Sequence, residues 1–139
     1  MSEAIVIDSS ALVALLSDAG AMGDWVASTL DRHTLAAPEL VMFETANILR
    51  RHQLAGRLAP VEATRAHQDL QSLPLQLWPY LPLACRAWEL RETLTAYDAS
   101  YVALAERLDG SLVTLDARLG RANGPHCQIL TPPQETMTS

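Results

Sequence analysis

The sequence contains no lysine, and all ten of its basic residues are arginines. A P-loop nucleotide site needs the lysine of its Gly-Lys-Ser/Thr motif. Phospho-aspartate enzymes and receiver domains also commonly place a lysine, a compact point charge, against the phosphoryl group. The composition therefore argues against both of these classes.

Cysteine is scarce as well, with only Cys85 and Cys127 in the chain. They form no Cys-x-x-Cys pair, and no histidine stands at the spacing of a zinc partner, so neither a disulfide framework nor a structural zinc site is indicated. The longest apolar run, residues 11–16, falls well short of the ~18 residues of a membrane span and lacks the basic flank of a signal peptide. We therefore expect a cytoplasmic protein without a membrane segment.

The length of 139 residues fits a single domain. A chain of this size buries roughly 68% of the surface that its unfolded form exposes, so a core forms without disulfides or structural metal. We expect one domain over residues 1–131 and a polar, frayed tail at 132–139. The formal net charge is −6, which taken alone argues against a nucleic-acid partner.

Short apolar runs rich in β-formers alternate along the chain with segments of helical periodicity. We expect strands at residues 4–7, 33–37, 75–79, 111–115 and 127–130. We expect helices at residues 11–16, 21–30, 39–54, 60–73 and 97–108, with Pro38 at the start of the third and another helix opening at Pro82. This alternation predicts a three-layer α/β/α domain with a mostly parallel five-stranded sheet.

Asp8 and Asp116 each follow a predicted strand and precede a helix. In a parallel sheet, sites form outside the carboxyl ends of the strands, so these two carboxylates are expected on the same rim. Each of them, like Asp98 at the start of another predicted helix, also suits a helix N-cap, where aspartate is among the best residues at about 1 kcal/mol. Capping therefore remains an alternative explanation for all three.

Glu44 projects from a largely apolar helical face. Its neighbours three and four positions away are Leu40, Val41, Asn47 and Ile48. A buried carboxylate costs several kcal/mol unless it is neutralised, paired or bound to a cation. The alternatives are an ion pair with Arg50 or Arg51, a helix rotated so that Glu44 lies at its edge, or a cation site.

The four acids, if they converge, need a positive partner. At ~4 Å each like-charged pair repels by about 4 kcal/mol at an effective dielectric of 20. Oxygen ligands without histidine or cysteine favour Mg²⁺ or Mn²⁺ over zinc. Removing four negative charges from the net −6 leaves about −2 on the rest of the chain, which no longer opposes contact with a phosphate backbone.

Four segments carry a family resemblance. In chain order they are residues 6–12 (VIDSSAL), 38–40 (PEL) leading to 44–47 (ETAN), 97–105 (YDASYVALA) and 112–116 (LVTLD). Together they resemble the PIN-domain nucleases, in particular the VapC-type toxins of bacterial toxin–antitoxin pairs. The match follows the family's order and spacing across nearly the whole chain.

The resemblance implies a structure, a site and partners. The structure is a parallel sheet flanked by helices, in a homodimer. A VapB-like antitoxin inhibits the protein by placing its C-terminal segment in an acidic groove, and the substrate is structured RNA, cut inside the chain. By this resemblance, the family's metal-binding acids correspond to Asp8, Glu44, Asp98 and Asp116. The hydroxyl residues that orient the site correspond to Ser10 and Thr114.

The expected chemistry is Mg²⁺- or Mn²⁺-dependent hydrolysis of RNA phosphodiester bonds. Asp8, Asp98 and Asp116 are the preferred ligands, and Glu44 is either a further ligand or the group that positions the attacking water. Some relatives carry another acid where residues 117–119 read Ala-Arg-Leu, so we expect one firmly held ion. Candidates for phosphate contact, with solvated faces or ion pairs as the alternative for each, are Arg50, Arg51, Arg57, Arg118 and Arg121.

Two other functions fit parts of the pattern. A PIN-like module that holds metal or RNA without cleaving it is one, although the intact set of four acids weighs against it. A phospho-aspartate hydrolase is the other, but Ser10 stands where its second aspartate belongs.

One apolar strip of the N-terminal helices suits either the core or a dimer or antitoxin surface, and it comprises Leu12, Leu15, Leu16, Val26 and Leu30.

Overall fold

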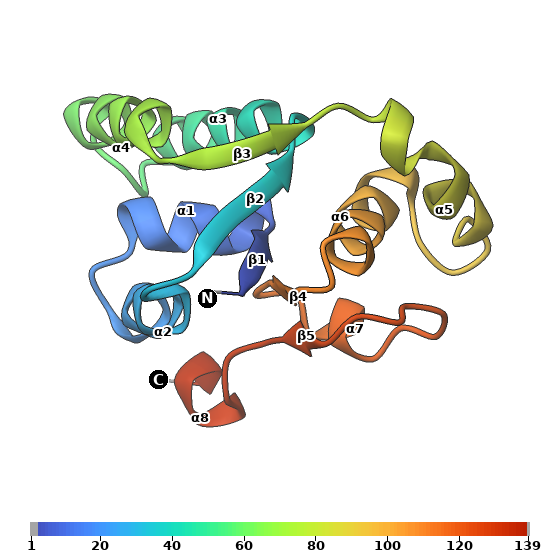
Figure 1. Cartoon of the computed structure of the whole chain (residues 1–139). Coiled ribbons are helices and arrows are strands. Elements are labelled where there is room, and N and C mark those ends of the chain that lie inside the picture. Colours follow the sequence, from blue (N-terminus) through green and yellow to red (C-terminus); the bar gives the residue numbers. More distant parts are fainter. Residues whose placement is uncertain (1–2, 139) are drawn as a thin grey trace.

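Five parallel strands form the centre of the structure, a computed structural model that describes the backbone of residues 3–138 and the side chains of residues 3–136 (Figure 1). The strands are β1 (Ala4–Ile7), β2 (Thr34–Pro38), β3 (Leu75–Trp78), β4 (Ser111–Val113) and β5 (Ile129–Leu130). Their order in the sheet is β3-β2-β1-β4-β5, and every neighbouring pair is parallel. The predicted parallel sheet is confirmed.

Helices cover both faces of this sheet. They are α1 (Ser9–Ser17), α2 (Ala21–Leu30), α3 (Leu40–Leu54), α4 (Pro60–Ser72), α5 (Ala84–Glu89), α6 (Ala96–Arg107), α7 (Ala117–Gly120) and α8 (Gln134–Thr138), with a 3₁₀ turn at Leu81–Leu83. Crossovers between parallel strands are right-handed. The steps outward from β1 to β3 therefore place α1–α4 on one face, and the return to β4 places α5 and α6 on the other, as Figure 1 shows.

The surface where α6 packs against β1, β2 and β4 forms a central part of the core. Val6 and Ile7 in β1 and Leu112 and Val113 in β4 are fully buried. Every residue of α6 from 99 to 105 is buried as well, because the helix lies between the sheet on one side and α5 on the other. A helix that is buried all round has no polar face, so the polar groups it carries need internal partners.

The neighbouring strands β1 and β4 are in register through Ile7 and Val113. β4 ends two residues earlier than the sequence predicts. The chain bends at Leu115, and the backbone N–H of Leu115 donates to the Ser10 hydroxyl at 3.0 Å instead of to another strand. The end of β4 is therefore tied to the start of α1.

Two prolines lie outside the helices that they were expected to open. Pro38 is the last residue of β2, paired with Trp78 of β3, and α3 begins two residues later. The N–H of Glu39 donates to the Trp78 carbonyl at 2.8 Å. Pro38, which has no N–H, therefore occupies a position where the strand pairing requires no backbone donor. Pro82 lies in the 3₁₀ turn before α5.

The C-terminal tail differs from the expectation of a frayed segment. It contains α8, which lies against α2 (Figure 1). Packing against α2 supplies the tertiary contacts that a helix this short needs. No helix of residues 3–138 is long and apolar enough to cross a membrane.

Candidate functional site

Asp8 is fixed at the carboxyl end of β1, where it caps α1. Only 7% of the residue is exposed. Its Oδ1 accepts hydrogen bonds from the Ser10 hydroxyl at 2.7 Å and the Ala11 N–H at 3.0 Å, and its Oδ2 accepts one from the Thr114 hydroxyl. Burial raises the pKa of Asp8, and the nearby charge of Asp98 raises it further, against these three hydrogen bonds. Asp8 is thus an oriented carboxylate that is short of positive charge.

Thr114 joins the ends of β1 and β4. It is fully buried, donates to Asp8, and accepts a hydrogen bond from the backbone N–H of Asp116 at 3.0 Å. The Ser10 and Thr114 hydroxyls lie 3.4 Å apart. The two hydroxyl residues that the sequence singled out therefore hold one aspartate and the backbone of another in a fixed relationship.

Asp116 follows β4 and caps the short helix α7. Its Oδ1 accepts from the Arg118 N–H at 3.0 Å and Nε at 3.2 Å, and Nη2 of the same arginine lies 3.1 Å from Oδ2. The hydrogen bond from the Arg118 side chain is the main cause that lowers the pKa of Asp116. Capping and ion pairing thus both occupy this carboxylate.

Asp98 lies in the first turn of α6 but is not its cap. Thr95 is the N-cap, and its hydroxyl accepts a hydrogen bond from the Asp98 N–H at 3.1 Å. Capping by the Asp98 side chain, one of the alternatives from the sequence, is therefore wrong. Burial and the charge of Asp116 raise the pKa of Asp98. The carboxylate of Asp98 is thus close enough to both other aspartates to feel their charge.

Glu44 lies on α3, half-buried, and has an unexpected partner. The hydroxyl of Tyr101 on α6 donates to Glu44 Oε1 at 2.5 Å. Burial and this hydrogen bond raise the pKa of Tyr101, and the charge of Asp8 adds to the effect, so the hydroxyl remains a donor at neutral pH. In the described part of the chain Glu44 forms no ion pair with Arg50 or Arg51, so that alternative is wrong.

Sequence reasoning missed Tyr101. The signal was present, because a phenol hydroxyl in the otherwise apolar stretch 101–105 of a buried helix must find a polar partner. Nothing in the sequence says that this partner is Glu44 on α3, which lies 57 positions earlier in the chain.

The carboxylates gather at one edge but do not form a closed ligand shell. Among residues 3–136, no three carboxylate, thiol or imidazole groups converge closely enough to hold an ion as they stand. Arg118 and Tyr101 instead hold two of the four acids. The donor set nevertheless fits a hard divalent cation, since it consists of oxygens alone and includes a buried aspartate whose charge burial disfavours.

A groove of about 530 Å³ opens beside this edge. Asp98 and Asp116 line it together with Arg118 and Arg121. Thr93 and Asn123 also line the groove, and the Thr93 hydroxyl donates to the Asn123 carbonyl at 3.0 Å. Acidic groups and guanidinium groups thus face the same space.

The remaining arginine candidates lie elsewhere. Arg50 lines a separate depression with Phe43 and His67 on α3 and α4. Arg51 and Arg57 are exposed, at the end of α3 and in the loop that follows it. Of the five arginines proposed for phosphate contact, the groove therefore brings together only Arg118 and Arg121 with the acids.

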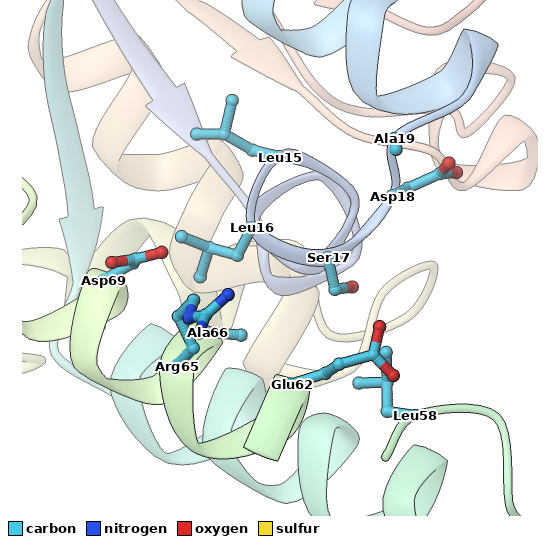
Figure 2. Close-up of a pocket in the computed structure, with 10 residues that line it drawn as sticks. All are labelled: Leu15, Leu16, Ser17, Asp18, Ala19, Leu58, Glu62, Arg65, Ala66 and Asp69. Atoms are coloured by element: carbon cyan, nitrogen blue, oxygen red, sulfur yellow. The ribbon is translucent and has the colours of Figure 1, made fainter. Parts of the chain in front are cut away.

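A further depression, of about 310 Å³, lies between α1 and α4 (Figure 2). It contains none of the four acids. Figure 2 shows Leu16 of α1 directed toward Ala66 of α4, and Leu15 also lines the space. Leu12, Val26 and Leu30 are buried in the core, so only Leu15 and Leu16 of the predicted strip reach this surface.

Comparison with known proteins places this arrangement in a family. The PIN domain model matches residues 5–125, which include all four acids. Ribonuclease VapC9 of Mycobacterium tuberculosis is 40% identical over 130 residues, covering 94% of this chain and 99% of that protein. The chain is a PIN domain of the VapC family.

Solved structures agree with this PIN domain in fold. PAE2754 from Pyrobaculum aerophilum has a TM-score of 0.69 and 28% identity, covering 91% of this chain and 83% of that one. VapBC2 from Rickettsia felis, solved with a DNA fragment from its promoter, has a TM-score of 0.66 and 13% identity. The match covers 92% of this chain and 98% of that one. The family assignment thus rests on the sequence matches, and these structures agree with it in fold.

Proposed function

We propose that this protein is a Mg²⁺- or Mn²⁺-dependent endoribonuclease toxin that hydrolyses RNA phosphodiester bonds and is inhibited by a cognate VapB-like antitoxin. The observation that carries the proposal is the approach of three aspartates from three separate elements, after β1, in α6 and after β4. The name of its relative VapC9, a ribonuclease, supports the same activity.

The chain's own residues have distinct roles in this proposal. Asp8, Asp98 and Asp116 hold the ion, directly or through water. Ser10 and Thr114 fix the carboxylate plane of Asp8 through their hydroxyl donors. Glu44, held by Tyr101, is a further ligand or positions the attacking water. A divalent ion in this place supplies Lewis acidity toward the phosphate and a nucleophile at neutral pH.

The proposed partners follow from charge and from the relatives. An RNA backbone enters the groove where Arg118 and Arg121 stand beside the acids, because guanidinium groups match phosphate oxygens in a bidentate manner. The VapB-like antitoxin places a segment at the same acidic edge, and two copies of the chain form a homodimer. The VapBC2 assembly, whose fold this chain shares, supports the antitoxin proposal.

The test of this function is cleavage of total RNA by the purified protein, resolved on a gel, with Mg²⁺ or Mn²⁺ and with or without EDTA. Asp98→Asn is compared with Asp31→Asn, an exposed aspartate after α2. We expect cleavage that needs the ion, is lost in Asp98→Asn and persists in Asp31→Asn. Adding the product of a short open reading frame directly upstream, where the antitoxin is expected, should stop the cleavage.

Two results would contradict the proposal. Cleavage that persists in EDTA would remove the metal-dependent mechanism, and full activity of Asp98→Asn would remove the carboxylate site. Binding of RNA and Mn²⁺ without any cleavage would favour the alternative, a PIN-like module that binds metal or RNA without cutting it.

A further inference from the structure

We propose that Arg118 is a built-in counterion of the acidic edge: it occupies Asp116 until a divalent ion takes that carboxylate, and it then binds a phosphate of the RNA. The inference rests on the proposed function and adds a regulatory role within the same site. It concerns one side chain that alternates between two anionic partners.

The first observation is the geometry of the contact. The guanidinium of Arg118 meets both oxygens of Asp116, with Nε at 3.2 Å from Oδ1 and Nη2 at 3.1 Å from Oδ2. This two-pronged contact uses both carboxylate oxygens, so an ion and Arg118 compete for the same lone pairs. Within the side chains that the structure places, Arg121 makes no comparable ion pair.

The second observation is that the contact is reversible. The Arg118 side chain is 85% exposed, whereas that of Asp116 is 29% exposed. An exposed ion pair is weak, since water solvates the released guanidinium and carboxylate. Arg118 can therefore offset the negative charge of Asp116 and still be displaced by an ion.

The third observation is where the released side chain would go. Arg118 lines the groove with Asp98, Asp116 and Arg121, so rotation about its own side-chain bonds leaves the guanidinium in the space proposed for the RNA. Its backbone N–H, which bonds to Asp116 at 3.0 Å, does not have to move. Release at Asp116 and capture of phosphate thus need no change in the backbone of α7.

Competition between the ion and Arg118 for Asp116 predicts opposite changes in the affinities for the ion and for RNA. Removing Arg118 takes away a competitor of the ion, so binding of the ion should become tighter. The same change removes a phosphate contact, so RNA binding should become weaker. A merely structural arginine would shift both in the same direction or neither.

The experiment measures Mn²⁺ dissociation from the RNA-free full-length chain by calorimetry or electron paramagnetic resonance. The variants are Arg118→Ala and Arg118→Lys, with Arg121→Ala as the control for loss of one positive charge in the same groove. The second readout is the total-RNA concentration that gives half-maximal cleavage at saturating Mn²⁺. Arg118 is exposed and α7 retains its backbone cap, so these variants should fold.

We expect Arg118→Ala to bind Mn²⁺ about fivefold more tightly, the factor that corresponds to the upper range of an exposed ion pair. The half-saturating RNA concentration should rise about fivefold, in keeping with one lost phosphate contact. Arg118→Lys, which keeps the charge but not the two-pronged geometry, should lie between wild type and Arg118→Ala. Arg121→Ala should raise the RNA concentration while changing Mn²⁺ affinity by less than twofold.

Several results would overturn the inference. These are unchanged or weaker Mn²⁺ binding in Arg118→Ala, equal tightening in Arg121→Ala, and an unchanged half-saturating RNA concentration in Arg118→Ala. The failure of the proposed function is distinguishable from these, because then the wild type itself would neither bind Mn²⁺ nor need it for cleavage, and the role of Arg118 would fall with it.

Discussion

The hydroxyl of Tyr101 donates a hydrogen bond of 2.5 Å to Glu44, and this contact links α6 to α3 at the carboxyl ends of the strands. Tyr101 is 2% exposed, so its hydroxyl has no access to bulk water as an alternative partner. The bond restrains the Glu44 carboxylate beside Asp8, whose charge also acts on the tyrosine. Tyr101 is therefore a positioning residue for Glu44.

Replacement of Tyr101 by Phe tests this relationship. We expect kcat to fall about tenfold with little change in KM, because Glu44 loses its orientation but the RNA contacts remain. The free energy of unfolding should fall by about 1 kcal/mol through the lost hydrogen bond. Tyr97→Phe, which changes an exposed tyrosine of the same helix, is the control. An unaltered kcat in Tyr101→Phe would show that Glu44 needs no positioning.

Thr114 offers a second test, because its hydroxyl both donates to Asp8 and accepts from the Asp116 N–H. Thr114→Val keeps the shape but removes both bonds and leaves the partly buried N–H of Asp116 without its acceptor. We expect a loss of about 1–3 kcal/mol of unfolding free energy and weaker Mn²⁺ binding, measured by urea denaturation and calorimetry. Thr114→Ser restores the hydroxyl, so it should recover most of the Mn²⁺ affinity. Equal Mn²⁺ affinity in Val and Ser variants would contradict the role.

Asp98→Asn should stabilise the protein when no divalent ion is bound. The raised pKa of Asp98 means that the folded state disfavours its charge at neutral pH, owing to burial and the nearby Asp116. We expect Tm in EDTA to rise by about 1–3 °C. In the wild type, Mn²⁺ at ten times its dissociation constant should add about 1.4 kcal/mol, and the variant should lose most of this gain.

The control for that measurement is Asp109→Asn. Asp109 is exposed and has a φ of 53°, a left-handed conformation that asparagine adopts readily. Its Tm should be unchanged in EDTA and should rise with Mn²⁺ as in the wild type. A clear fall of Tm in EDTA for Asp98→Asn would mean that the carboxylate supports the fold.

Glu106 predicts a dependence of stability on pH away from the metal site. Burial alone would raise its pKa, but hydrogen bonds from the Arg86 side chain and the His126 N–H outweigh burial, so the pKa is lowered. The Arg86 Nε lies 2.7 Å from Glu106 Oε1. Because its pKa is lowered in the folded state, ionised Glu106 stabilises the fold at pH values above the unfolded-state pKa of about 4.3. This contribution disappears as the pH falls through the folded-state pKa.

We expect Glu106→Gln to reduce the unfolding free energy by about 1–3 kcal/mol at pH 7. The difference from wild type should shrink as the pH is lowered below about 4, in urea titrations at several pH values. Glu92→Gln, at an exposed glutamate in the loop after α5, should follow the wild type throughout. A difference that stays constant down to pH 3 would show that the charge of Glu106 contributes nothing.

Most of the fold was readable from the residues. Alternating apolar runs and helical periodicity predicted the strands, and the structure confirms an all-parallel sheet of five. The misplaced boundaries share a cause, which is competition from tertiary contacts. Pro38 ends β2 because β3 lies beside it, and β4 stops where Leu115 turns to the Ser10 hydroxyl.

The acids of the candidate site were also readable as residues, but their partners were not. Asp8 and Asp116 follow strands, so sequence order and a parallel sheet suffice to place them on one rim. The bonds from Tyr101 to Glu44 and from Thr114 to Asp8 join positions 57 and 106 apart. No local pattern encodes such pairs.

The sequence by itself determined which chemistry is available, because residue types fix the donor atoms, the absence of lysine and the excess of acids. The tertiary structure alone decided which carboxylate meets the Thr114 hydroxyl, which meets the Tyr101 hydroxyl and which remains short of positive charge. The physical reason is that charge, burial and hydrogen bonding act over a few ångströms in space. Pairing of β1 with β4 and packing of α6 against both strands bring those groups within that range.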